Sequence, residues 1–279
     1  MLTRILGSAV SASPALKRTL WRKWYQFLAR GYRQTDWTFM NYGYADGAEA
    51  SGKSLFLEAA DESDRFSIQL YHAVVAAVDI QNRKVLEVGS GRGGGCSYIA
   101  RYLLPERIVG VDYSLNAVAL SRERHAAVAP RLEFQQGDAE ALPCDADAFD
   151  VVVNVESSHC YGSMERFLGE VHRVLRPNGY FVWADMRPRD QWDATLAQFR
   201  NAGLEMREEA IITPNVLLAL DAVSDRKQEA IRRQVPKYLL AWFQDFAGVR
   251  GTRVYESLRS GEVEYRRCVL QTPAAATTL

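Results

Sequence analysis

Short apolar runs alternate with segments of helical periodicity through the middle of the chain. The strand-like runs lie at residues 85–88, 108–111, 132–136 and 149–156, and after Gly179. A helix is expected at 64–78, because apolar residues recur there every three or four positions. This alternation continues to about Asp185 and predicts an α/β fold with a mostly parallel sheet joined by right-handed crossovers.

The pattern changes beyond Pro188. Helices are predicted up to Arg200, at 216–234 and at 237–246, with strand-like runs at 204–212 and 263–270. We interpret the helices between the two late strands as a cap inserted over the substrate side, and 273–279 as a frayed tail. The chain then divides into a helical lid with its linker (1–82), a core (83–188) and the rest of the sheet with its cap (189–279).

The first 35 residues predict an amphipathic basic helix. They hold seven basic side chains and no acidic one, and an apolar stripe includes Trp24 and Tyr32 at helical spacing. The stripe could pack on the core while the charges face water. Alternatively it could line a lipid-sized pocket as a lid, or touch an anionic membrane surface peripherally. The pattern leaves these alternatives open.

Composition narrows the functional classes. The 279 residues include 34 basic and 34 acidic side chains, so the zero net charge gives no global reason to bind nucleic acid. No uninterrupted apolar stretch reaches the roughly 18 to 20 residues of a membrane span. The four cysteines are widely spaced, which argues against a disulfide or zinc framework and favours a cytoplasmic protein without a metal. The oligomeric state is left open, with a homodimer as one alternative.

A glycine-rich loop follows the first strand-like run and is typical of nucleotide binding. Gly89, Gly91 and Gly94 fit a G-x-G-x-x-G dinucleotide pattern, whereas Glu87, Gly89, Gly91 and Gly93 fit an acidic-x-G-x-G-x-G pattern. Glycine permits backbone to turn sharply and to approach a ligand closely. The loop alone does not decide between the two patterns.

The segments after the next two strands discriminate better. Asp112 and Tyr113 end the second strand, where a carboxylate would accept hydrogen bonds from two ribose hydroxyls of either cofactor. The third unit continues into Gly137-Asp138-Ala139 and a Leu-Pro pair, which a dinucleotide-binding half has no reason to contain. The series resembles the class I S-adenosylmethionine-dependent methyltransferases, whose fold is Rossmann-like.

This resemblance implies a set of cofactor contacts. In such enzymes the carboxylate of the Gly-Asp-Ala segment takes the adenine amine, and the next backbone N–H reaches a ring nitrogen, which assigns these roles to Asp138 and Ala139. The expected cofactor is S-adenosyl-L-methionine, with S-adenosyl-L-homocysteine as product. The candidate cofactor residues are Glu87, Gly89, Gly91, Gly93, Asp112, Tyr113, Asp138, Ala139, Asn154, Asn41 and Tyr42. Asn41 and Tyr42 are included because an amide can bind an amino-acid end and an aromatic ring can cover a sulfonium; an ordinary turn is the alternative.

The catalytic candidates follow the fourth strand. His159 lies where the carboxyl ends of the strands form a ligand crevice, and could act as a base that titrates near neutrality. Glu156, three residues earlier, could orient the imidazole or approach the sulfonium. A loop histidine that only packs locally is the alternative.

Other residues are candidates for the acceptor site. They are Trp24, Tyr32, Tyr44, His72, Tyr161 and Arg187. For His72, a place in the helix before the first strand without a role in the site is the alternative, and for Arg187 it is an ordinary ion pair. His125 is expected on an exposed helix face, and His172 is expected to be structural.

Segments from 21–44 to 248–269 resemble one subfamily, the mycobacterial phthiotriol and phenolphthiotriol dimycocerosate methyltransferases and related fatty-acid O-methyltransferases. The resemblance implies an O-methyltransferase acting on a hydroxyl or carboxylate of a hydrophobic fatty-acyl or polyketide-type acceptor. A C- or N-methyltransferase of a small secondary metabolite is the alternative within enzymes. A non-catalytic lipid-binding protein and an NAD-dependent oxidoreductase are the alternatives from other classes.

Overall fold

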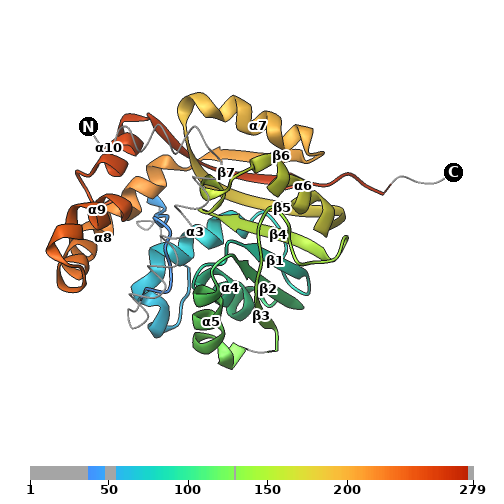
Figure 1. Cartoon of the computed structure of the whole chain (residues 1–279), viewed down its shortest axis with the longest axis horizontal. Coiled ribbons are helices and arrows are strands. Elements are labelled where there is room, and N and C mark those ends of the chain that lie inside the picture. Colours follow the sequence, from blue (N-terminus) through green and yellow to red (C-terminus); the bar gives the residue numbers. More distant parts are fainter. Residues whose placement is uncertain (1–36, 48–54, 129, 276–279) are drawn as a thin grey trace.

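A seven-stranded sheet forms the centre of the protein (Figure 1). The computed structural model describes residues 37–47, 55–128 and 130–275. The strands are β1 (Lys84–Val88), β2 (Arg107–Asp112), β3 (Leu132–Gln136), β4 (Phe149–Val155), β5 (Leu175–Pro188), β6 (Glu205–Ile211) and β7 (Val263–Gln271). Their order across the sheet is β3-β2-β1-β4-β5-β7-β6, and β7 runs antiparallel to both of its neighbours. The expected mostly parallel α/β sheet is confirmed.

Helices cover both faces of this sheet and gather at one end of it (Figure 1). The α-helices are α3 (Arg65–Val75), α4 (Gly94–Tyr98), α5 (Leu115–Arg124), α6 (Met164–Val174), α7 (Trp192–Asn201), α8 (Thr213–Gln234), α9 (Leu240–Phe246) and α10 (Arg253–Ser260). The shorter turns are η2 (Ala59–Asp64), η3 (Ile99–Leu103, a π-helix), η4 (Ala126–Val128), η5 (Ser158–Cys160), η6 (Arg189–Gln191) and η7 (Lys237–Leu239). Helices α8, α9 and α10 lie between β6 and β7 in the chain, where the sequence predicted an insertion.

Successive residues of the central strands enter different hydrophobic cores because side chains alternate across a strand. Val85 of β1 belongs to the core under α3, α4 and α5, which also receives residues of α8 and α10. Leu86, the next residue, belongs to the core under α6 and α7. Both side chains are fully buried, which explains why the central strands are almost continuously apolar.

Helix α10 is the one element of the cap that the hydrophobic pattern did not predict. It is eight residues long, follows Thr252 and ends at Gly261, which has a φ of 76°. A glycine just beyond a short amphipathic run is a known helix-ending signal, so this helix could have been found from the sequence.

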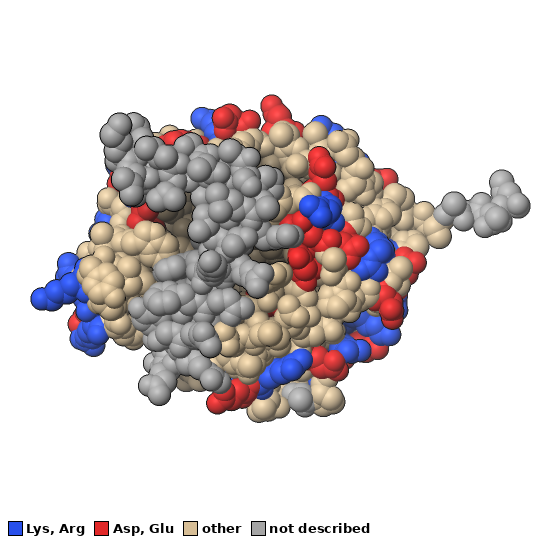
Figure 2. Space-filling model, in the orientation of Figure 1, with Lys and Arg blue, Asp and Glu red and all other residues tan. Residues whose placement is uncertain are grey.

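No helix in the described residues is both long enough and apolar enough to cross a membrane. Figure 2 shows acidic and basic side chains interspersed among the described residues of the face that it draws. Charged side chains are also paired across β6 and β7, as in the contact between Arg266 and Glu209 at 2.5 Å.

Candidate functional site

The glycine loop after β1 adopts the alternate-glycine pattern. Gly89, Gly91 and Gly93 have φ values of 77°, 53° and 82°, in the left-handed region that favours glycine. Gly94 is not among the glycines with positive φ and is the first residue of α4. The backbone therefore requires glycine at every second position, which matches the acidic-x-G-x-G-x-G reading and not G-x-G-x-x-G.

Two glycines in this loop make room for protein side chains. A Cβ at Gly89 would lie 2.4 Å from the Ser157 Oγ, and one at Gly95 would lie 2.1 Å from the Tyr71 ring. A Cβ at Gly91 would meet only the flexible end of Met40, at 3.2 Å. The space beside Gly91 therefore opens into a cavity.

This central cavity, of about 170 Å³, lies at the carboxyl ends of β1, β2, β3 and β4. Its wall includes the glycine loop and the residues that follow each of these strands. The sequence-predicted residues that line it are Gly89, Gly91, Asp112, Tyr113, Asp138, Ala139, Asn41, Glu156 and Tyr161. Ligands of open parallel sheets bind in this position.

Asp112 ties the glycine loop to the end of β2. Its Oδ2 accepts a hydrogen bond from the Gly91 N–H at 2.8 Å, and its Oδ1 accepts one from the Ser114 N–H at 2.8 Å. Burial raises the pKa of Asp112 to about 6, although these two hydrogen bonds oppose the shift. The carboxylate keeps lone pairs that could accept hydroxyl groups of a ligand.

Four predicted cofactor residues lie outside the wall of this cavity: Tyr42 lines a second cavity beside it, and Glu87, Gly93 and Asn154 support the glycine loop. Glu87 is fully buried and accepts a hydrogen bond from the Tyr71 hydroxyl at 2.7 Å. Gly93 caps α4. The Asn154 amide donates to the Val88 carbonyl at 2.9 Å and to the Ser157 Oγ at 2.7 Å.

Glu156 is held in a strained conformation at the edge of the cavity. Its φ of 51° is uncommon for a residue other than glycine. Its Oε2 accepts the Tyr42 N–H at 2.8 Å, whereas its buried Oε1 has no hydrogen-bond partner. Burial raises its pKa to about 8, and the charge of His159 and the Tyr42 N–H oppose that shift.

We expect the wild-type protein to lose more thermal stability between about pH 6 and pH 8 than a Glu156→Gln variant. Because its pKa is raised, Glu156 favours folding in its protonated form; that contribution is complete below the ordinary carboxyl pKa and is lost as the pH rises through about 8. Glutamine keeps an acceptor for the Tyr42 N–H but does not ionise. Melting temperatures across this range test the prediction, and parallel curves for the two proteins would contradict it.

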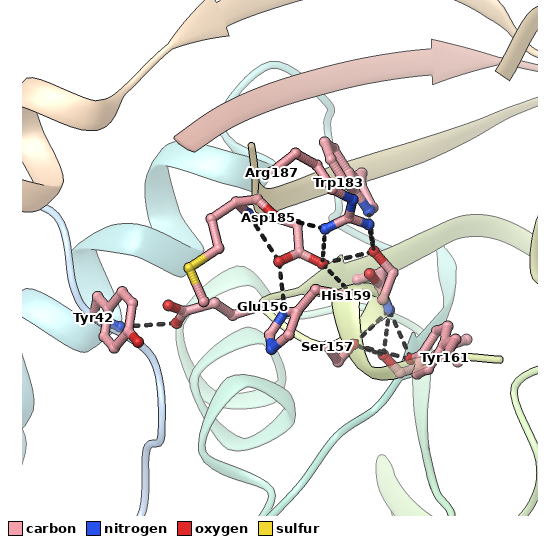
Figure 3. Close-up of polar contacts among 12 residues, drawn as sticks. Tyr42, Glu156, Ser157, His159, Tyr161, Trp183, Asp185 and Arg187 are labelled. Carbon is pink, nitrogen blue, oxygen red and sulfur yellow. Dashed lines mark hydrogen bonds and ion pairs between the residues drawn. The ribbon is translucent and has the colours of Figure 1, made fainter. Parts of the chain in front are cut away.

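His159 is oriented by Asp185, which lies near the end of β5 (Figure 3). The His159 Nδ1 lies 2.8 Å from Asp185 Oδ1, and the His159 N–H donates to Asp185 Oδ2 at 2.9 Å. Glu156 was expected to orient the imidazole or to approach the sulfonium; its Oε2 accepts the Tyr42 N–H, and it is Asp185 that holds the imidazole Nδ1. Asp185 became the partner because β4 and β5 pair in parallel, with Val155 opposite Ala184.

The electrostatics of this pair differ from those of a free imidazole. Burial alone lowers the pKa of His159, but the charges of Cys160 and Asp185 and the hydrogen bond to Asp185 raise it well above its usual value. Burial opposes ionisation of Asp185, but the cations His159 and Arg187 hold its pKa well below the usual range. The pair stabilises imidazolium beside carboxylate, so His159 is expected to titrate above the usual imidazole pKa.

Arg187 also serves this buried network. It forms an ion pair with Asp185 at 3.1 Å and donates to the Ser158 Oγ at 2.8 Å. Its guanidinium lies over the Trp183 ring (Figure 3). Arg187 lines neither the central cavity nor a second cavity that adjoins it at residues 39–41, so the structure does not bring it to a place for an acceptor.

The remaining predicted acceptor residues are dispersed. His72 lies outside both cavities, with its Nδ1 2.8 Å from the Tyr98 hydroxyl, and Tyr44 also lies outside them. Tyr161 lines the central cavity beside the glycine loop. Trp24 and Tyr32, with the whole predicted lid helix, lie outside the described residues. Among the candidates that the structure describes, only Tyr161 lines the central cavity, so these do not form a common acceptor surface.

His125 is not on an exposed helix face as expected. It ends α5, half-buried, with its Nε2 3.2 Å from the Arg92 carbonyl and its ring 5.9 Å from that of Phe134. Its position behind the glycine loop explains the difference, because a Cβ at Gly93 would lie 2.9 Å from the ring.

The sequence analysis did not identify Asp185 as the partner of His159. It also did not identify Lys227, which lines the second cavity, the one that adjoins the central cavity at residues 39–41. Asp185 follows the apolar run 181–184, and an acidic residue after a buried strand is the same signal that identified Asp112. Lys227 lies in the cap helix α8, and nothing in its local sequence distinguishes it from a surface lysine.

Comparisons with known proteins agree with this geometry. Residues 86–183 match a methyltransferase domain family. The chain is 40% identical over 92% of its length to a phthiotriol/phenolphthiotriol dimycocerosates methyltransferase of Mycobacterium tuberculosis, of which 94% is covered. A fatty-acid O-methyltransferase of Mycolicibacterium smegmatis is also 40% identical, with 90% of this chain and 89% of that protein covered.

Solved structures share the fold at lower identity. The cyclase SpnF has a TM-score of 0.68 at 19% identity, covering 91% of this chain and 95% of that one. Geranyl diphosphate C-methyltransferase from Streptomyces coelicolor A3(2), crystallised with Mg²⁺, geranyl diphosphate and S-adenosyl-L-homocysteine, has a TM-score of 0.63 at 16% identity, covering 88% and 98%. These two structures support the fold only, and the reaction has to be argued from the residues of the site.

Proposed function

Since the chain belongs to the class I S-adenosylmethionine-dependent methyltransferases, we propose that it transfers a methyl group to a hydroxyl or carboxylate oxygen of a hydrophobic, lipid-type acceptor. The observation that carries this proposal is the pair of adjoining cavities. The central cavity lies at the glycine loop, and a second cavity shares Phe39, Met40, Asn41 and Arg92 with it. The names of the two curated relatives support a lipid acceptor.

The central cavity fits S-adenosylmethionine in its donors and in its free space. Asp112 would accept the ribose hydroxyls, and Asp138 with the Ala139 N–H would hold the adenine. Gly91 leaves room for close approach, because a Cβ there meets only Met40. The buried Oε1 of Glu156, a residue of the cavity wall, has no hydrogen-bond partner. A positively charged sulfonium in the cavity would offset the cost of burying this oxygen.

Bound S-adenosylmethionine would supply a methyl group on a positively charged sulfur. The protein has to exclude water and to align the acceptor oxygen with that methyl group. A carboxylate acceptor is already ionised at neutral pH and needs no base. A hydroxyl acceptor must lose its proton, and the imidazole of His159 could take it only after losing the proton that Asp185 favours.

We expect Asp112→Ala to weaken binding of S-adenosylhomocysteine by about one to two orders of magnitude, because hydrogen bonds to charged groups contribute about 1.5 to 3 kcal/mol each. The variant also loses the tie to the Gly91 N–H, so part of the loss would come from a looser loop. Titration calorimetry would measure the affinity. Asp145→Ala, on an exposed loop residue, is the control and should bind as wild type does. An unchanged affinity in a folded Asp112→Ala protein would remove Asp112 from the site.

Incubation with methyl-labelled cofactor and a lipid extract, followed by mass spectrometry, tests the reaction itself. A methyl ester or methyl ether on a long-chain lipid is the expected product. A label on carbon or nitrogen would favour the alternative C- or N-methyltransferase. Binding of cofactor and lipid without any transfer would favour a lipid-binding protein and contradict the proposal.

A further inference from the structure

A side cavity of about 350 Å³ adjoins the central one and is lined mainly by apolar groups. Phe66, Phe243 and Phe246 contribute aromatic rings, and Val223 and Ile231 of α8 contribute aliphatic side chains. Rings of this kind cover an alkyl chain well, because aromatic side chains bring a large apolar surface. Residues 39–41 line both cavities, so the side cavity lies directly beside the place proposed for the cofactor.

One cationic side chain in this cavity lacks a carboxylate partner. Lys227 of α8 lines the wall, and its Nζ donates to the Ala247 carbonyl at 3.5 Å, a long and weak hydrogen bond. Among the described residues no carboxylate oxygen lies within 4.0 Å of this Nζ. Burial lowers the pKa of Lys227 to about 8; the charge of Glu156 opposes that shift and the charge of Arg226 adds to it.

The carboxylate that interacts electrostatically with Lys227 is already engaged. Glu156 gives its Oε2 to the Tyr42 N–H and belongs to the wall of the central cavity. An ammonium without a counter-ion in an apolar site is unfavourable, whereas a ligand anion entering the site would offset that cost. The cavity therefore offers an apolar surface for a chain and, in Lys227, a cation for an acidic head group; Arg92 and Arg226 line the same wall.

We propose that Lys227 binds the carboxylate of a long-chain acid in the side cavity, so that the protein distinguishes an ionised fatty acid from a neutral alcohol of the same chain length. This inference rests on the proposed function, because it selects the acid among the acceptors considered there. The raised pKa of His159 agrees with it, since an imidazole that keeps its proton is a poor base and an anionic acceptor needs none.

Binding of dodecanoate and of 1-dodecanol tests the assignment, measured by calorimetry at pH 7 in the presence of S-adenosylhomocysteine. Lys227→Met keeps the length of the side chain and removes its charge. We expect this variant to bind dodecanoate about tenfold or more weakly than wild type does, and to bind dodecanol within about twofold of wild type. Lys227→Arg should retain most of the preference for dodecanoate. Lys237→Met, a matched change at an exposed lysine of η7, should alter neither affinity.

Several outcomes would overturn the proposal. One is an equal affinity of wild type and Lys227→Met for dodecanoate, and another is a wild type that does not prefer dodecanoate to dodecanol. A third is an equal loss of affinity for both ligands in Lys227→Met, which would mean that the side chain only shapes the cavity. Thermal unfolding adds a second measurement. Because Lys227 has no ion-pair partner in the described part of the chain, its replacement should not lower the melting temperature, and a large drop would indicate a structural role.

The labelled-methyl assay separates this inference from the proposed function. If dodecanoate binding depends on Lys227 but no lipid is methylated, the binding site stands and the methyl-transfer proposal fails. If lipids are methylated but dodecanoate binding is indifferent to Lys227, the methyl-transfer proposal stands and this inference fails.

Discussion

Replacing His159 with alanine is expected to slow the methyl-transfer step by about 10² to 10⁴-fold on a hydroxyl acceptor and by less than about tenfold on a carboxylate acceptor. The larger value is the usual contribution of a positioned base, and the smaller one reflects an acceptor that is already ionised. Asp185 raises the pKa of His159, so the wild-type rate on a hydroxyl acceptor should rise with pH above neutrality and not around the usual imidazole value.

Single-turnover rates across pH, on a fatty acid and on a hydroxylated lipid, would measure both effects. Cofactor affinity should be nearly unchanged in His159→Ala, because His159 does not line the central cavity. A pH-independent loss below tenfold on the better of the two acceptors would eliminate His159 as the base.

Replacing Asp185 with alanine is expected to reduce the free energy of unfolding by about 3 to 5 kcal/mol, the usual result of removing one partner of a buried ion pair. The change leaves His159 and Arg187 without their carboxylate, and also removes the acceptor of the Ser158 hydroxyl. Because the pKa of Asp185 is lowered on folding, its stabilisation is present above the ordinary carboxyl pKa and is lost as the pH falls.

Urea unfolding at neutral pH and at about pH 2 would show the loss and its decrease in acid. Glu133→Ala is the matched control, because Glu133 pairs with Arg107 on the surface, where both side chains are about half exposed. That variant should lose at most about 1 kcal/mol. A similar small loss for Asp185→Ala would show that the buried network contributes little.

The fold could be predicted from the sequence because each strand and each turn at the site has its own local pattern of apolar residues or glycines. Apolar runs at 85–88 and 149–156 are long enough to identify buried strands, and Gly89 and Gly91 mark a turn that only glycine accommodates well. Asp112 follows from its place at a strand end, a position fixed within its own segment.

The partner of His159 could not be predicted in this way because it depends on strand register. Glu156 is three residues from His159 and Asp185 is 26 residues away, yet the parallel pairing of Val155 with Ala184 places the ends of β4 and β5 side by side. A shift of one residue would turn the Asp185 side chain to the other face of the sheet. The cavity position of Lys227 likewise depends on how α8 packs against residues of the loop 37–42.

The segment 38–42 lies between the central cavity and the side cavity and lines both. Thr38 to Asn41 line the central cavity, Phe39 to Tyr42 line the side cavity, and the Tyr42 N–H holds Glu156. If one ligand displaces this segment, the room left for the other ligand changes, and the two binding equilibria are then thermodynamically coupled. By reciprocity, the factor by which a fatty acid alters cofactor affinity must equal the factor by which the cofactor alters fatty-acid affinity. If both factors equal one, the segment 38–42 does not move when either ligand binds. If both factors differ from one by the same amount, this segment transmits the occupancy of each cavity to the other.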